Sequence, residues 1–212
     1  MKEDILEQLV DDYLQNERYF TRHNLKFKPM KEAIGFETKK DSVASDVDVV
    51  GFNPLRKGPD RVWVVSCKSW QAGFNPSRFI ADIEKGIEQE KEMKQGKKFT
   101  GRPAWKYFRE LVKPKWADAF LAEIERLTGT RSFTYVTAVT KLIGSDTKWT
   151  NYEMFKQNLQ GNPIKILTLD KILQDLYKNI NPTVASSDVG RLLQVIKASG
   201  WMKRKDSDLG LG

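Results

Sequence analysis

The stretch SDVDVVGFNPLRKGPDRVWVVSCKSW, residues 45–70, contains two short apolar runs joined by a turn. Val47 to Phe52 and Val62 to Val65 are rich in β-branched and aromatic residues, which favour strands. Residues 53–59 between them include an asparagine, a glycine and two prolines, a composition typical of turns. The stretch therefore predicts a hairpin of adjacent strands.

Charged residues stand at one end of this predicted hairpin. Asp46 and Asp48 open the first strand, and Lys68 closes the second. Alternation along a strand places both aspartates on one face, although Asp46 can equally cap the turn before the strand. Carboxylates beside a lysine are typical of metal-dependent phosphodiester cleavage, because oxygen ligands hold Mg²⁺ while the cation offsets developing negative charge.

These residues resemble the motif of the PD-(D/E)XK restriction-endonuclease-like superfamily, closest in pattern to its Mrr-like and Holliday-junction-resolvase-like nucleases. The motif has an Asp at the start of one strand, Glu-x-Lys at the end of the next, and a Glu on the preceding helix. Asp48, Lys68 and Glu7 match it, and Ser66 stands where the motif has Glu. The resemblance implies an α/β fold with an αβββαβ core, in which helices flank a mixed central sheet.

The serine leaves two alternatives open, because a hydroxyl is a neutral and weak metal ligand. Either another acid has taken over or the site no longer cuts. In some members of the superfamily the acid comes from the next helix, so Asp82 and Glu84 are candidates for a migrated acid; they also suit exposed helix charges paired with lysines. Gln71 resembles a glutamine that follows the lysine in related nucleases, although most loop glutamines face water.

The resemblance also implies roles for the matched residues. Asp48 would bind Mg²⁺ or Mn²⁺, with Asp46, the backbone carbonyl of Cys67 and Glu7 completing the oxygen shell. Lys68 would position or deprotonate the attacking water and offset charge in the transition state. The Cys67 thiol itself should point to the opposite face of the strand, into the core.

Composition favours a polyanionic partner. Lysine and arginine number 36 against 28 acids in 212 residues, which gives a formal charge of +8 and a pI near 9.4. Such a charge attracts nucleic acid through its phosphates. Ordinary solvated lysines, an RNA or an acidic protein partner would give the same balance.

Cysteine and hydropathy bear on the compartment. The single cysteine excludes an internal disulfide and a C-x-x-C zinc site, which suits a cytoplasmic protein. The chain lacks an apolar run near the ~20 residues that span a bilayer, and its acidic, amphipathic N-terminus is not a signal peptide, so we expect no membrane association.

Two polar stretches predict contacts with nucleic acid. Residues 29–45 form a turn-rich loop with lysines, and residues 94–116 interleave cations with aromatic side chains, a composition that suits a groove along a phosphate backbone. The alternative for the second stretch is a helical insertion whose aromatic residues are core. The candidate contacts are Arg22, Lys39, Lys40, Lys97, Lys98, Arg102 and Lys106.

The order of patterns predicts one α/β domain with additions. We expect a nuclease-like domain over residues 1–180, a helical insertion at about 97–130, and a C-terminal helical extension over 181–212. The remaining elements are expected as a helix at 3–16, a strand at 18–28, helices at 76–94 and 117–127, strands at 132–139 and 164–167, and helices at 150–160 and 170–178.

Two functions follow from these patterns. The first is a metal-dependent DNA endonuclease with a variant Ser-x-Lys motif, acting on duplex or branched DNA. The alternative is a non-catalytic DNA-binding or protein-interaction module on the same fold. Because a cut across both strands generally needs two active sites, the first function suggests a homodimer, which no residue demonstrates.

Overall fold

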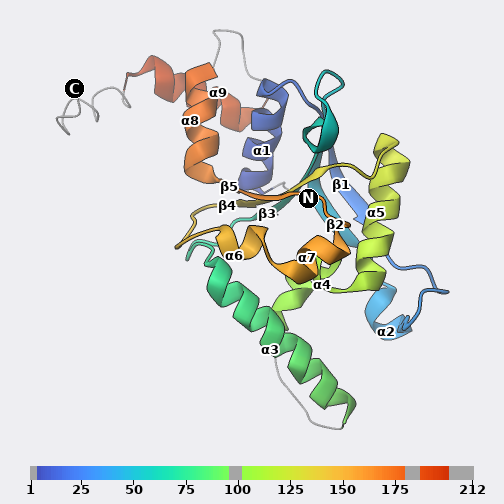
Figure 1. Ribbon diagram of the computed structural model, residues 1–212. Helices are drawn as coiled ribbons and strands as arrows, with labels where there is room; N and C mark the ends of the chain where they lie inside the picture. The colour runs from blue at the N-terminus through green and yellow to red at the C-terminus, as the bar shows by residue number, and fades with distance from the viewer. Residues whose placement is uncertain (1–3, 96–101, 180–186, 201–212) are drawn as a thin grey trace.

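The computed structural model describes residues 4–95, 102–179 and 187–200, and its centre is a five-stranded mixed sheet with helices on both faces (Figure 1). The sequence-based expectation of an α/β fold with a mixed sheet flanked by helices is confirmed. The strands, which lie side by side in chain order, are β1 (Phe20–Phe27), β2 (Ser45–Phe52), β3 (Val62–Lys68), β4 (Thr134–Val139) and β5 (Ile164–Thr168).

Strand direction decides which residues share an edge of the sheet. β1, β2 and β3 pair antiparallel, whereas β3, β4 and β5 pair parallel. The end of β3 therefore lies beside the start of β2 and the ends of β1, β4 and β5. Lys68, which closes β3, shares this edge with Asp46 and Asp48, which open β2.

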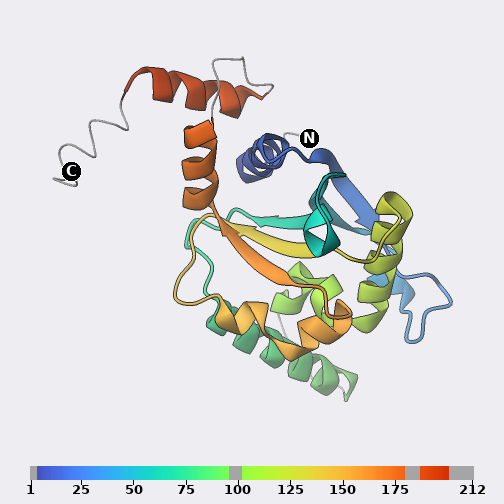
Figure 2. The ribbon, with the colours of Figure 1, turned by 45° about the horizontal axis from the view of Figure 1, so that its top comes forward.

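One face of the sheet is covered by α1 (Ile5–Asn16) and α8 (Leu169–Asn179), as Figure 2 shows. The Asp4 side chain caps α1 by accepting a hydrogen bond from the Leu6 N–H. Apolar side chains of both helices pack on the strand residues that face them, including Val49, Val65 and Val136. Cys67 packs against this same cluster, so its side chain points away from that of Lys68.

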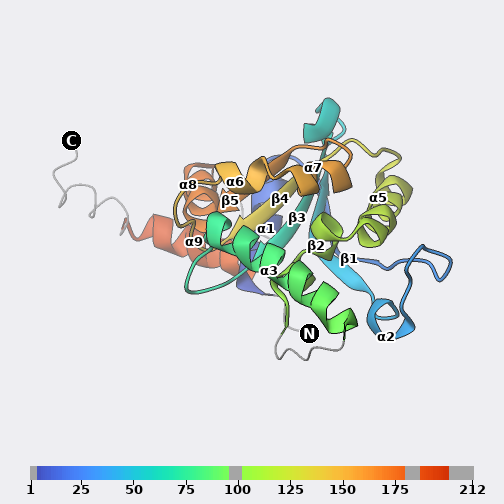
Figure 3. The same cartoon turned by 60° about the horizontal axis from the view of Figure 1, so that its bottom comes forward.

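The opposite face is covered by the segments between β3 and β5, which Figure 3 views from outside. They are α3 (Pro76–Lys94), η2 (Ala104–Tyr107), α4 (Arg109–Val112), α5 (Pro114–Thr128), α6 (Thr147–Thr150) and α7 (Glu153–Asn158). Trp105, Phe108 and Trp116 are buried here, whereas Tyr107 is exposed, so most described aromatic side chains of this segment are core. The described part of the insertion packs on the sheet and contributes side chains to the hydrophobic core on this face.

The remaining elements lie outside these layers. A short α2 (Thr38–Asp41) interrupts the loop between β1 and β2, and η1 (Gly58–Arg61) precedes β3. The C-terminal helix α9 (Asp188–Ala198) contacts α1 and α8. In the ranges that the structure describes, no helix combines the length and the apolar character needed to cross a membrane.

The alternation of β1 and β2 is broken beside Asp48. Asn24 has a φ of 52°, in the left-handed region that asparagine tolerates better than most residues. His23 and Leu25, on either side of Asn24, lie on opposite faces of the sheet: His23 contacts Asp11 of α1, whereas Leu25 belongs to the core under α5. The site described next therefore lies where the regular strand geometry changes.

Candidate functional site

The Asp48 carboxylate bridges β2 and β3 where their backbone pairing stops. The paired residues run from Phe52 with Val62 to Val49 with Val65. Beyond them the Cys67 N–H donates to Asp48 Oδ2 at 2.5 Å, so a side chain takes the place of a backbone carbonyl. This contact fixes the carboxylate at the end of β3.

Lys68 lies over this junction. Its Nζ donates to Ser66 Oγ at 2.7 Å and to the Cys67 carbonyl at 3.1 Å, and it is 4.0 Å from Asp48 Oδ2. The Lys68 and Asp48 side chains are 15% and 16% exposed. The ammonium is also 5.2 Å from the centre of the Phe108 ring, which closes one side of the site. Asp48 and Lys68 therefore form a partly desolvated pair.

The surroundings of Asp48 oppose its ionisation. Burial raises the pKa of Asp48 above its ordinary value, and the nearby Asp46 charge adds to this. Lys68, the Cys67 N–H and the Ser66 hydroxyl act in the opposite direction without cancelling the effect of burial. A carboxylate in such a place is stabilised by a further cation.

A second acid, Glu110, lies behind this pair and is 4% exposed. Glu110 belongs to α4, and its Oε1 accepts a 2.5 Å hydrogen bond from the Tyr135 hydroxyl of β4. Ser66 is close enough to the Tyr135 hydroxyl to lower its pKa, against the larger effect of burial, which raises it. Burial raises the pKa of Glu110, and Lys68 and Asp48 act on it electrostatically. Sequence analysis missed both Glu110 and Tyr135.

The two other acids predicted as ligands lie around the pair. Asp46 is exposed, and its charge is close enough to raise the pKa of Asp48. Glu7 lies on α1, on the face of the sheet that Cys67 occupies, and contributes to raising the pKa of the Cys67 thiol, for which burial is the main cause. Asp4, at the start of the same helix, accepts a hydrogen bond from the Ser69 hydroxyl at 2.7 Å. The start of α1 is thus fixed beside the end of β3.

The candidates that follow Lys68 in the sequence are on the surface. Gln71 is exposed in the loop before α3. Asp82 and Glu84 lie on the exposed face of α3, and Glu84 accepts a hydrogen bond from the Tyr152 hydroxyl at 2.8 Å. The buried acid next to Lys68 and Asp48 is therefore on α4 rather than α3.

A groove of about 1440 Å³ lies at the same edge of the sheet. Its walls are the end of β1, the loop with α2, and parts of α3, α4 and α5. Lys26, which lines it, is the strand partner of Asp46, and Arg109, also in its wall, is adjacent to Glu110. The groove therefore lies at the same edge of the sheet as the acidic site, although Asp48, Lys68 and Glu110 are not among the residues that line it.

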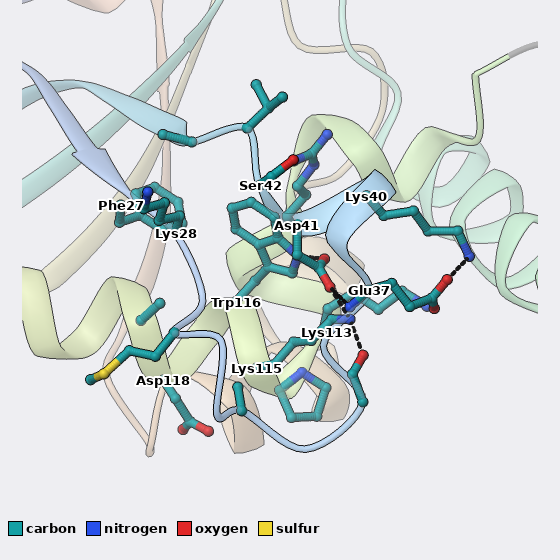
Figure 4. Close-up of a pocket in the computed structure, with 18 of the residues that line it drawn as sticks. Phe27, Lys28, Glu37, Lys40, Asp41, Ser42, Lys113, Lys115, Trp116 and Asp118 are labelled. Carbon is teal, nitrogen blue, oxygen red and sulfur yellow. Dashed lines mark hydrogen bonds and ion pairs between the residues drawn. The ribbon is translucent and has the colours of Figure 1, made fainter.

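One wall of the groove is held by the buried Asp41 (Figure 4). Its carboxylate accepts hydrogen bonds from Lys115 Nζ at 2.6 Å, the Trp116 indole at 3.1 Å and the Glu37 N–H at 2.7 Å. Lys115 also donates to the Gly35 carbonyl at 2.6 Å. These contacts attach the loop between β1 and β2 to α5.

Three of the predicted nucleic-acid contacts lie together, and the others do not. Lys39, Lys40 and Lys106 line the groove. Arg102 stacks 4.5 Å from the centre of the Tyr107 ring and donates to the Lys106 carbonyl, whereas Arg22 lies in a separate hollow beside Phe52. The predictions for Lys97 and Lys98 fall outside the described residues.

The oxygen atoms of the site supply some of the ligands that a hard divalent cation requires. Asp48 and the Cys67 carbonyl offer oxygen atoms beside one another, both within reach of Lys68. Over residues 4–95, 102–179 and 187–200, no three side chains of His, Cys, Asp or Glu are grouped to hold a metal ion. Mg²⁺ is commonly held by one or two carboxylates with water and substrate phosphates, so three such side chains are not required.

Comparison of the chain with protein-family models, with curated proteins and with solved structures found no match. The fold and the site define an α/β protein with a buried polar cluster at one edge of its sheet. The PD-(D/E)XK resemblance therefore rests on the residues of this chain alone.

Proposed function

We propose that the protein is a metal-dependent DNA endonuclease of the PD-(D/E)XK type, with a variant Ser-x-Lys motif and a restriction-endonuclease-like core, acting in the cytoplasm. The observation that carries this proposal is the pair formed by Asp48 and Lys68, 4.0 Å apart at the junction of β2 and β3. A regular hairpin needs no such pair. A partly buried carboxylate beside a lysine is typical of a functional site.

Asp48 and the Cys67 carbonyl would hold Mg²⁺ or Mn²⁺, whereas Asp46 and Glu7, the other acids expected from the sequence, would act on the site through their charge. The bound cation would activate water and polarise a phosphodiester. Lys68 would offset negative charge on the phosphate and orient the attacking water. Its hydrogen bond with Ser66 fixes the ammonium in advance, which favours catalysis through preorganisation.

DNA is the proposed substrate because of the groove beside the site. Lys39, Lys40, Lys106 and Arg109 contribute cations to its walls, and the chain carries a net charge of +8. Phosphate contacts of this kind bind DNA without reading its sequence. We therefore expect duplex or branched DNA to enter along the groove, with cleavage of both strands requiring two copies of the site.

The test is cleavage of supercoiled plasmid and of branched DNA in Mg²⁺ or Mn²⁺. The proteins compared are the wild type, Lys68→Ala, Asp48→Asn and the control Lys57→Ala, whose lysine lies in the turn at the opposite end of β3. We expect metal-dependent cutting by the wild type and the control, and a loss of at least about 100-fold in both site variants. EDTA should abolish cutting.

Non-catalytic DNA binding is the second candidate, and the buried Ser66 favours it. This residue is 4% exposed and presents a neutral hydroxyl where the motif has an acid. Wild type that binds plasmid but leaves it intact in both metals would establish this second function. Cutting that persists in Lys68→Ala would show that the nuclease site lies elsewhere, and a single-stranded RNA substrate in the same assay distinguishes RNA from DNA.

A further inference from the structure

Glu110 is a buried acid to which the proposed reaction assigns no role. It is fully enclosed under the sheet, and the Tyr135 hydroxyl donates to its Oε1 at 2.5 Å. A glutamine would accept the same hydrogen bond without a buried ionisable group. Because burying a carboxyl group is costly, its presence in the core points to a cation at this place.

Tyr135 and Ser66 lie between Glu110 and the pair formed by Asp48 and Lys68. Tyr135 on β4 is the strand partner of Val64, which lies two residues before Ser66 and shares its face of β3. Ser66 is close enough to the Tyr135 hydroxyl to act on its pKa, and Ser66 Oγ accepts from Lys68 Nζ at 2.7 Å. Glu110 and Ser66 are therefore both neighbours of the same tyrosine hydroxyl.

The residue that precedes α4 also contacts the site. Phe108 precedes α4, and the centre of its ring lies 5.2 Å from Lys68 Nζ. Glu110 comes two residues later and points to the sheet.

We infer that Glu110 supplies the acidic oxygen that Ser66 lacks, so that Asp48, the Cys67 carbonyl and Glu110 together form a binding site for Mg²⁺ or Mn²⁺. This inference rests on the proposed function. Two carboxylates and one backbone carbonyl leave coordination positions for water and phosphate oxygens, as Mg²⁺ sites commonly do. The set contains fewer than three ligating side chains, which agrees with the absence of a larger cluster in the described residues.

Binding of Mn²⁺ alone tests the inference, measured by calorimetry and by electron paramagnetic resonance of the free ion. The variants are Glu110→Gln, Asp48→Asn and the control Glu88→Gln on the exposed side of α3. We expect the first two to weaken Mn²⁺ binding by about 10- to 100-fold, and the control to bind as the wild type does. Circular dichroism verifies that each variant is folded.

A relocated acid provides the sharpest comparison. The double variant Ser66→Glu with Glu110→Gln returns the carboxylate to the strand, so it should recover most of the Mn²⁺ affinity that Glu110→Gln loses. Failure of this double variant to bind, when it is folded, would contradict the inference. Crystals of the wild type soaked in MnCl₂ add a test without substitution, in which anomalous density should lie within bonding distance of a Glu110 oxygen.

The outcomes separate the two proposals. If Asp48→Asn loses Mn²⁺ while Glu110→Gln binds it normally, Glu110 serves only the fold and the nuclease proposal stands. Anomalous density on Asp48 but away from Glu110 leads to the same result. If the wild type does not bind Mn²⁺, both the inference and the metal-dependent function are overturned.

Discussion

At the scale of single residues, Cys67 contributes through its backbone. Its N–H donates to Asp48 and its carbonyl accepts from Lys68, whereas its side chain packs on the other face of the sheet. Burial raises the pKa of the Cys67 thiol well above its ordinary value, so the nucleophilic thiolate is scarce at neutral pH. The residue between Ser66 and Lys68 therefore matters for its position in the strand.

This arrangement predicts the behaviour of Cys67→Ala. The substitution keeps both backbone groups and removes only the buried sulfur, so Mn²⁺ affinity and plasmid cleavage should stay within about twofold of the wild type. Stability should fall by about 1 kcal/mol, because a small cavity opens beside α1. Loss of cleavage in a folded Cys67→Ala protein would show instead that the thiol takes part in the reaction.

The sequence predicted that Asp48 and Lys68 lie at one end of a hairpin, and the two side chains are 4.0 Å apart at the start and the end of adjacent strands. Glu110 was not predictable in this way, because it follows Lys68 by a long segment whose basic and aromatic residues dominate the pattern. The four residues of α4 are too few for a helical period. Burial of one acid among them depends on the tertiary packing of α4 against β4.

At the scale of elements, the loop between β1 and β2 depends on Asp41. Lys115, the Trp116 indole and the Glu37 N–H all donate to this carboxylate, which is 2% exposed. Burial alone would raise the pKa of Asp41, but these partners lower it below its ordinary value. The turn-rich composition of residues 29–45 predicted a loop without revealing this attachment to α5.

Asp41→Asn should loosen the wall of the groove. We expect a loss of about 2 kcal/mol at pH 7, because the charge that Lys115 pairs with is removed. Since the folded pKa of Asp41 lies below its unfolded value of 3.8, the stabilisation is present above that pH and is lost as the pH falls through the folded pKa. The difference between the two proteins should therefore shrink below about pH 4.

Urea unfolding at pH 7 and at pH 3 measures this effect. Limited trypsin digestion should cut the Asp41→Asn protein faster in the loop before β2, at Lys31 or Lys39. Asp118→Asn is the matched control, because it neutralises an exposed acid on the same helix as Lys115. An equal difference in stability at both pH values would contradict a role for the Asp41 charge.

At the scale of the whole molecule, local patterns predicted the layers of the fold. The β-branched runs of β2 and β3 and the apolar stripes of α1 and α3 indicated a sheet flanked by helices, and the structure has both. Local patterns do not contain the order in which the strands pair, nor the face of the sheet on which the insertion packs. Trp105, Phe108 and Trp116 were ambiguous between core and surface because helical spacing fits both, and their burial follows from packing against the sheet.

Strand order places the site and the groove at the same edge of the sheet. If DNA follows this groove to the site, the affinity for DNA should depend on the salt concentration. DNA binding should weaken as salt rises, because each phosphate contact releases counterions and contributes roughly 0.9 to the logarithmic slope. Lys39→Ala and Lys106→Ala should each lower that slope by about 0.9, since both lysines line the groove. Lys57→Ala removes the same charge at the opposite end of the sheet and should leave the slope unchanged. Fluorescence anisotropy of a labelled duplex without metal, over a series of KCl concentrations, measures the slopes, and equal slopes for all three variants would mean that DNA does not follow this groove.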